Sequence, residues 1–131
     1  GLAYYAYSQL QGSQGPMPWF AGAGVAPEHV EQAITAIRAE IGRIQNEKVP
    51  ADELADSQAF RIGSIPVSLE TNSGLASVIT DLEMHGLGLD YLQRFPDLVR
   101  AITPERVQAA AQKYLSTEQL AVAVAGPESS D

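Results

Sequence analysis

The most regular apolar pattern in the chain lies in Pro27-Glu28-His29-Val30-Glu31-Gln32-Ala33-Ile34-Thr35-Ala36-Ile37-Arg38-Ala39-Glu40-Ile41-Gly42-Arg43-Ile44. Its branched apolar residues recur every three or four positions, at Val30, Ile34, Ile37, Ile41 and Ile44. This spacing is typical of one face of an α-helix. Pro27 suits the first helical position, where its missing N–H costs nothing. The stretch therefore predicts an amphipathic helix with one buried side.

Two strands are predicted before this helix, over residues 2–10 and about 17–25. The first alternates apolar positions and contains three tyrosines, and turn-forming residues fill the linker 11–16. Gly22 and Gly24 in the second strand indicate a β-bulge or a close backbone approach. Because the chain opens directly in strand-like sequence, we expect it to be a piece of a larger protein, cut within or just before a strand.

Further helices are predicted after the break at Val49-Pro50. The first starts at Pro50, has Asp52 and Glu53 in its first turn, and runs to about Ile65, where Pro66 is expected to kink or end it. The next has capping oxygens at Thr71-Asn72-Ser73 and is stopped by Gly86-Leu87-Gly88. A short helix covers roughly 90–101, interrupted near Phe95-Pro96, and a last helix starts at Thr103-Pro104 and runs through Tyr114. A closing strand is predicted over 120–125.

The order of strands and longer helices is ββ-αααα-β. This order predicts an α+β fold, an antiparallel sheet with helices packed on one face. We expect a single domain over residues 1–127, truncated at its N-terminal side, and a short tail over 128–131.

Composition excludes some classes of partner. The 131 residues have a net charge of −8, which argues against a nucleic-acid partner and against adhesion to anionic lipid. There is no cysteine, so no disulfide and no thiolate zinc site can form. No apolar run approaches the roughly 20 residues that a membrane-spanning helix needs. We expect a soluble protein whose compartment stays open, with the cytoplasm slightly favoured.

Metal and dinucleotide sites have little support in the sequence. His29 and His85 are the only histidines, and Asp81 and His85 could share a helical face, but no third ligand lies near them. The stretch Gly22-Ala23-Gly24-Val25-Ala26-Pro27 lies between a strand and a helix, yet it has Pro27 where the dinucleotide fingerprint requires glycine. We therefore expect no metal-binding and no cofactor-binding residue in this chain.

Nucleophilic and paired-carboxylate chemistry is equally weak. The candidate serines lack a glycine-elbow context and a suitably spaced histidine; they are Ser8, Ser13, Ser64 and Ser68. Glu70, Asp81 and Glu83 form a loose acidic cluster, for which a solvated helix surface is the simpler interpretation. A tyrosine in a strand, such as Tyr4, is by itself most often a packing residue.

An ordered set of short stretches nevertheless resembles one family. They are Gly1-Leu2-Ala3-Tyr4 with Tyr7-Ser8; Ala21-Gly22 before Pro27-Glu28-His29-Val30; Gly63-Ser64-Ile65-Pro66-Val67-Ser68-Leu69-Glu70-Thr71-Asn72-Ser73-Gly74-Leu75-Ala76; Glu83; Gly86-Leu87-Gly88-Leu89-Asp90-Tyr91; Thr103-Pro104-Glu105; Ala111; Lys113-Tyr114; and Val122-Ala123-Val124-Ala125-Gly126-Pro127. Together they resemble the C-terminal, non-zinc domain of the insulinase/processing-peptidase (pitrilysin-like, inverzincin) zinc metallopeptidases, over nearly the whole chain.

The resemblance implies a half-clamshell unit that consists of two α+β domains. Two such units, on one chain or on two, enclose a peptide chamber. Zinc is held in that family by an H-x-x-E-H helix in the N-terminal domain of one unit, a motif that this chain lacks. The partner half contributes an arginine–tyrosine pair. Tyr4 matches the tyrosine, and the arginine would lie seven residues before it, upstream of Gly1. Zinc is therefore expected in the missing N-terminal domain or in a partner subunit.

The role implied for Tyr4 is that of a transition-state donor. In that family a zinc-bound water attacks the peptide carbonyl with a glutamate as general base. A phenol O–H directed at the carbonyl oxygen would stabilise the charge that develops there. Tyr5 and Tyr7 are expected on the opposite face of the strand by alternation, as packing residues.

The functional hypothesis is a C-terminal domain fragment of a zinc-dependent peptidase, inactive by itself, which completes the substrate chamber and contributes Tyr4 toward the scissile carbonyl. Its expected partners are a peptide substrate and the other peptidase domain or a homologous subunit, in a homo- or heterodimer. Two alternatives stay open. One is a catalytically silent partner subunit of the same fold, and the other is a generic α+β interaction domain that uses an exposed sheet edge.

Overall fold

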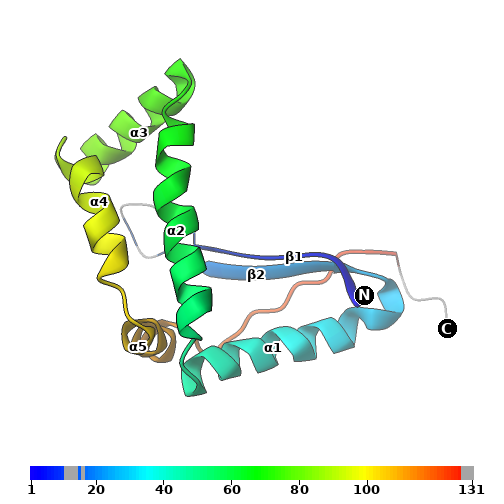
Figure 1. Ribbon diagram of the computed structural model, residues 1–131. Helices are drawn as coiled ribbons and strands as arrows, with labels where there is room; N and C mark the ends of the chain where they lie inside the picture. Colours follow the sequence, from blue (N-terminus) through cyan, green and yellow to red (C-terminus); the bar gives the residue numbers. More distant parts are fainter. Residues whose placement is uncertain (11–14, 16, 128–131) are drawn as a thin grey trace. The chain divides into compact units, whose positions relative to one another are not determined.

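The computed structural model describes residues 1–10, 15 and 17–127 of the chain (Figure 1). Its elements, in chain order, are β1 (Ala3–Leu10), β2 (Trp19–Val25), the 3-10 helix η1 (Pro27–His29), α1 (Val30–Asn46), α2 (Ala51–Ser68), α3 (Asn72–Met84), α4 (Tyr91–Arg100) and α5 (Pro104–Tyr114). The predicted α+β class is confirmed by an antiparallel sheet followed by helices. Most of the predicted linker 11–16 and the whole tail 128–131 lie outside the described residues.

The strands β1 and β2 form an antiparallel pair. Their register runs regularly from Leu10 opposite Trp19 to Tyr5 opposite Gly24, after which Ala3 lies opposite Val25. From Ala3 to Tyr5 the first strand advances by two residues, whereas from Val25 to Gly24 the second strand moves by one. Tyr4 is therefore the extra residue of a β-bulge. The irregularity predicted from the glycines of the second strand is therefore present, with its extra residue on the first strand.

Helix α1 forms because its first turn and its apolar stripe agree. Pro27 occupies the first position of η1, which leads directly into α1. All five stripe residues are buried or half-buried, and Ile41 and Ala33 are the most enclosed residues of α1. Helix α1 contacts β2, and in Figure 1 it runs back below the two strands. The amphipathic helix predicted from the sequence is confirmed.

The chain divides into two compact units. The first comprises Gly1–Glu47 and Ala110–Asp131, and the second comprises Lys48–Ala109. In the first unit, the far end of α1 is joined to the end of α5 by two side-chain amides: Gln45 Nε2 donates to the carbonyl oxygen of Leu115, and Gln112 Nε2 donates to that of Gln45. These exchanged hydrogen bonds connect segments that lie far apart in the sequence.

The second unit is built around α2, which contacts both α3 and α4. The Nε2 of Gln58 on α2 donates to the carbonyl oxygens of Val99 and Ile102, at 2.9 Å each. Carbonyl groups at a helix C-terminus have no partner within the helix, and the Gln58 amide supplies one for the end of α4. Lys48 and Glu105 also form an ion pair inside this unit, with Nζ 2.9 Å from Oε1.

The predicted boundaries of α3 are confirmed at both ends. Thr71 is its N-cap, with Oγ1 accepting a hydrogen bond from the N–H of Gly74 at 3.0 Å. At the other end Gly86 has φ +60°, and the N–H of Leu87 donates to the carbonyl oxygen of Leu82 at 2.9 Å. A left-handed glycine with this bond is the Schellman stop of a helix.

Two local predictions were wrong. Helix α4 runs unbroken across Pro96, where an interruption was predicted. Proline removes one backbone donor, and α4 continues with that one hydrogen bond missing. Helix α2 also continues past Pro66 and ends two residues later, at Ser68. The predicted closing strand over 120–125 does not form, and β1 and β2 are the only strands among the described residues. Alternating apolar residues favour a strand only where a neighbouring strand pairs with their backbone groups.

Candidate functional site

Tyr4, the one candidate site residue, lies at the bulge of β1. Its side chain is 84% exposed, although an aromatic ring usually gains by burial. A bulge leaves its extra residue outside the ladder and changes the direction of the side chain, which is why bulges recur beside active sites. The local backbone therefore presents a free phenol at the end of the hairpin. The role of Tyr4 itself stays a prediction.

Tyr5 and Tyr7 pack over the two glycines of β2. A β-carbon built on Gly24 would lie 2.3 Å from Cε1 of Tyr5, and one built on Gly22 would lie 3.0 Å from the Tyr7 ring. The two rings are stacked, with centroids 6.3 Å apart and planes inclined by 28°. Aromatic residues paired across strands with glycine cover the exposed glycine backbone. The glycines therefore provide a close approach, not a phosphate-binding loop.

The histidines lie in different units and neither is part of a metal cluster. His29 ends η1, and His85 is the C-cap of α3. Nδ1 of His85 lies 2.9 Å from the backbone carbonyl oxygen of Asp81. Since a carbonyl only accepts, Nδ1 carries the proton in this contact. Among residues 1–10, 15 and 17–127, no three His, Cys, Asp or Glu side chains converge to hold a metal ion.

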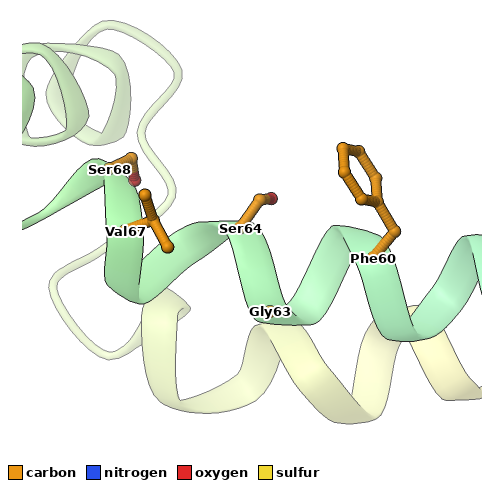
Figure 2. A pocket seen from close by; sticks show the side chains of 5 residues that line it. All are labelled: Phe60, Gly63, Ser64, Val67 and Ser68. Atoms are coloured by element: carbon orange, nitrogen blue, oxygen red, sulfur yellow. The ribbon is translucent and has the colours of Figure 1, made fainter.

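The serines are engaged with the backbone. Ser64 Oγ donates to the carbonyl oxygen of Arg61 at 2.9 Å, and Ser68 Oγ donates to that of Ile65 at 2.7 Å. Both line an open apolar hollow on α2, and Figure 2 shows Ser64 between Phe60 and Val67 along the helix, with Ser68 beyond Val67. Ser8 lies in β1 opposite Ala21, and Ser13 lies outside the described residues. None of the described serines is arranged with a base as a nucleophile would be.

Several carboxylates form ion pairs with nearby cationic side chains. Arg94 donates to Asp90 at 2.7 Å and holds the pKa of that carboxyl below its usual value. Hydrogen bonds, first from Lys48, lower the pKa of Glu105 to about 2. Asp81 and Glu83 are two residues apart in α3, a spacing that turns two side chains to different sides of a helix. Glu70 follows the end of α2. Paired-carboxylate catalysis therefore has no geometric basis here.

Comparison with known proteins gives one family match. Residues 1–60 match the family model of the peptidase M16 inactive domain, whereas no curated protein matches the chain. The matched segment spans β1, β2, η1, α1 and the first part of α2, and it includes Tyr4. This match agrees with the family predicted from the sequence motifs and places residues 1–60, a little under half of the chain, in a peptidase-family domain. No helix in the described part of the chain has the length and apolar character needed to cross a membrane.

Sequence analysis missed two features. The first is the pairing of Tyr5 with Gly24 and of Tyr7 with Gly22. The two tyrosines and the two glycines are each two residues apart, so one antiparallel register brings both pairs together. The second is the exposed apolar face of α2, where Phe60 is 72% and Val67 63% exposed. Their separation of seven residues places both on one side of a helix, but that spacing alone does not distinguish a buried from an exposed stripe.

Proposed function

We propose that this chain is the C-terminal, non-zinc part of a zinc-dependent peptidase, which completes the substrate chamber and directs the Tyr4 hydroxyl toward the scissile carbonyl. The observation that supports this role is the position of Tyr4, exposed at a β-bulge inside the segment that matches the peptidase family. Tyr5 and Tyr7 are also exposed, at 62% and 55%, but their rings stack on each other.

The chemistry asked of Tyr4 is transition-state stabilisation. During attack on a peptide bond, negative charge develops on the carbonyl oxygen. A hydroxyl donor positioned beside that oxygen stabilises the tetrahedral state more than the planar substrate, and so increases kcat. Removal of one such donor typically lowers the rate by about 10²–10³. The phenol group acts here as a hydrogen-bond donor and keeps its own proton.

The metal belongs elsewhere in this proposal. The described residues do not fit a metal centre, since no three ligating side chains converge among them. The zinc of the active peptidase would be held by the N-terminal domain or by a partner subunit. Binding of a peptide substrate would then require both halves, so the chain has a partner domain or subunit and is inactive alone.

The test is Tyr4→Phe in the complete, zinc-loaded peptidase. We expect kcat to fall by roughly 10²–10³ with little change in KM, because the lost bond acts mainly in the transition state. Tyr7→Phe is the matched control, since it removes a hydroxyl from a packing ring of the same strand. Unchanged turnover in Tyr4→Phe would reject the donor role. The 131-residue chain alone, supplied with zinc, is expected to cleave no peptide.

A second candidate is a catalytically silent subunit with the same fold. It is favoured by the description of the matched family model as an inactive domain. The residue seven positions before Tyr4 in the complete gene distinguishes the two. An arginine there, with an H-x-x-E-H motif in the same gene or a neighbouring one, supports the peptidase. Any other residue at that position supports the silent subunit.

A further inference from the structure

Two tyrosines in β1 and two glycines in β2 share the same spacing. Tyr5 and Tyr7 are two residues apart, as are Gly22 and Gly24, and the register places Tyr5 opposite Gly24 and Tyr7 opposite Gly22. Residues two apart in a strand lie on the same face of the sheet. Both rings therefore lie on one face, each over the backbone of its own glycine, as the distances to built β-carbons show.

This register is the one that creates the bulge at Tyr4. If the pairing that begins with Ala3 opposite Val25 continued without the extra residue, Tyr5 would lie opposite Ala23 and Tyr7 opposite Ala21. Both rings would then meet a methyl group where they now lie on bare backbone. The close approach at Gly24, 2.3 Å for a β-carbon, leaves no room for such a group without moving the ring.

We propose that Tyr5 and Gly24 act together as a positioning device for Tyr4: the Tyr5 ring, seated over Gly24, selects the bulged register and so fixes where the Tyr4 phenol stands. Without the extra residue, Tyr4 would lie opposite Gly24, and Tyr5 and the residues after it would change faces relative to β2, so the register also sets the direction of the Tyr4 side chain. The role in catalysis rests on the function proposed for Tyr4, whereas the effect on register does not. Tyr5 is in this view a positioning residue that does not touch the substrate.

The contact needs the ring of Tyr5 but not its hydroxyl. Tyr5→Phe keeps the aromatic face over Gly24, whereas Tyr5→Ala removes it. Gly24→Ala keeps the ring of Tyr5 but places a methyl group where the ring now lies. Gly22→Ala is the matched glycine control, because its β-carbon would meet the Tyr7 ring at 3.0 Å and lies further from the bulge. These four variants distinguish the effect of the Tyr5 ring, the effect of the space over Gly24, and the general effect of replacing a glycine in the strand.

The first experiment is NMR on the 131-residue chain and needs no activity. In the wild-type protein we expect the Gly24 α-protons to be shifted upfield by the Tyr5 ring, with cross-peaks between the two residues. Tyr5→Phe should retain both signals. Tyr5→Ala and Gly24→Ala should lose the shift and move the Tyr4 amide resonance, whereas Gly22→Ala should leave Tyr4 unchanged. A Tyr4 resonance unaffected by Tyr5→Ala would overturn the proposal.

The second experiment is a double-mutant cycle in the complete peptidase. Tyr5→Ala should lower kcat by up to about 10²-fold, the size of loss that a misplaced group causes, with KM little changed. In a Tyr4→Phe background the same change should have almost no effect, because the group it positions is absent. Equal losses in both backgrounds would show a merely structural role and overturn the proposal.

The two experiments distinguish failure of this inference from failure of the proposed function. If Tyr4→Phe leaves turnover unchanged, the donor role of Tyr4 is rejected, and the NMR comparison still decides whether Tyr5 and Gly24 set the register. If Tyr4→Phe is inactive but Tyr5→Ala is not, the donor role stands and the positioning device is rejected.

Discussion

Gly74 in the first turn of α3 lies against the backbone of Ser68, the last residue of α2. A β-carbon built on Gly74 would lie 1.8 Å from the carbonyl oxygen of Ser68 and 3.1 Å from Oγ1 of the capping Thr71. A backbone oxygen cannot move aside as a flexible side chain can. The tight connection between α2 and α3 is therefore possible only without a side chain at position 74.

Gly74→Ala should destabilise the chain by roughly 2–3 kcal/mol, the cost of an overpacked contact that forces a backbone shift. The measurement is urea unfolding followed by circular dichroism. Gly63→Ala is the control, because a β-carbon at Gly63 in α2 would meet no atom within 4 Å. That change should stabilise by about 0.5–1 kcal/mol, since alanine is the better helix former. Equal effects from both substitutions would contradict the close contact.

Thr71→Ala should cost about 1 kcal/mol, because the N–H of Gly74 loses the Oγ1 acceptor that caps α3. Thr71→Ser keeps a hydroxyl at the same place and should retain most of the stability. The free energies of unfolding of the two variants, compared with the wild type, test the cap. If serine and alanine were equally destabilising, lost packing of the methyl group would be the cause instead.

Gln58→Met should destabilise by about 1–2 kcal/mol, because it keeps the length of the side chain but removes two hydrogen bonds to carbonyl oxygens. Hydrogen exchange should also show faster opening of the last turn of α4. Gln32→Met provides the control at an exposed position of α1, where we expect a change within about 0.5 kcal/mol. No difference between the two variants would argue against the Gln58 cap.

The ion pair between Lys48 and Glu105 gives a pH dependence with a defined sign. The pKa of Glu105 is lowered to about 2 from its usual 4.5, first by the hydrogen bond from Lys48. A lowered folded-state pKa means that the contribution of the pair to stability is present above pH 4.5 and disappears as the pH falls toward 2. Both groups are exposed to solvent, so the effect on stability is small.

Lys48→Met should raise the pKa of Glu105 toward, but not up to, its usual value, because hydrogen bonds from the backbone and from Thr103 remain. A titration of the Glu105 side-chain carbon by NMR measures this directly. The stabilities of the wild type and the variant should differ above pH 5 and converge near pH 2. A titration of Glu105 unaffected by Lys48→Met would contradict the pair.

Several elements follow from local sequence because their causes are local. The stripe from Val30 to Ile44, the proline before it, the Thr71 cap and the Gly86 stop all act within one or two helical turns. The structure confirms each of them. The family, too, was predicted from short motifs, and the match over residues 1–60 agrees with it.

The wrong predictions share a different cause. Pro96 lies within α4, where the loss of one N–H does not interrupt the helix, and α4 packs against α2. Residues 120–125 have a strand-like pattern but no strand pairs with them in the described part of the chain. A propensity describes one segment of sequence, whereas the formation of a helix or strand also depends on the tertiary contacts of that segment.

The candidate site divides in the same way. The place of Tyr4 in the first strand of an α+β domain could be predicted from the chain alone, because alternation and motif order are properties of the chain. The folded structure was needed to show that Tyr4 is exposed as the extra residue of a bulge, and that Tyr5 and Tyr7 lie over Gly24 and Gly22. A register joins two strands, so the steric fit between ring and glycine exists only after the strands pair.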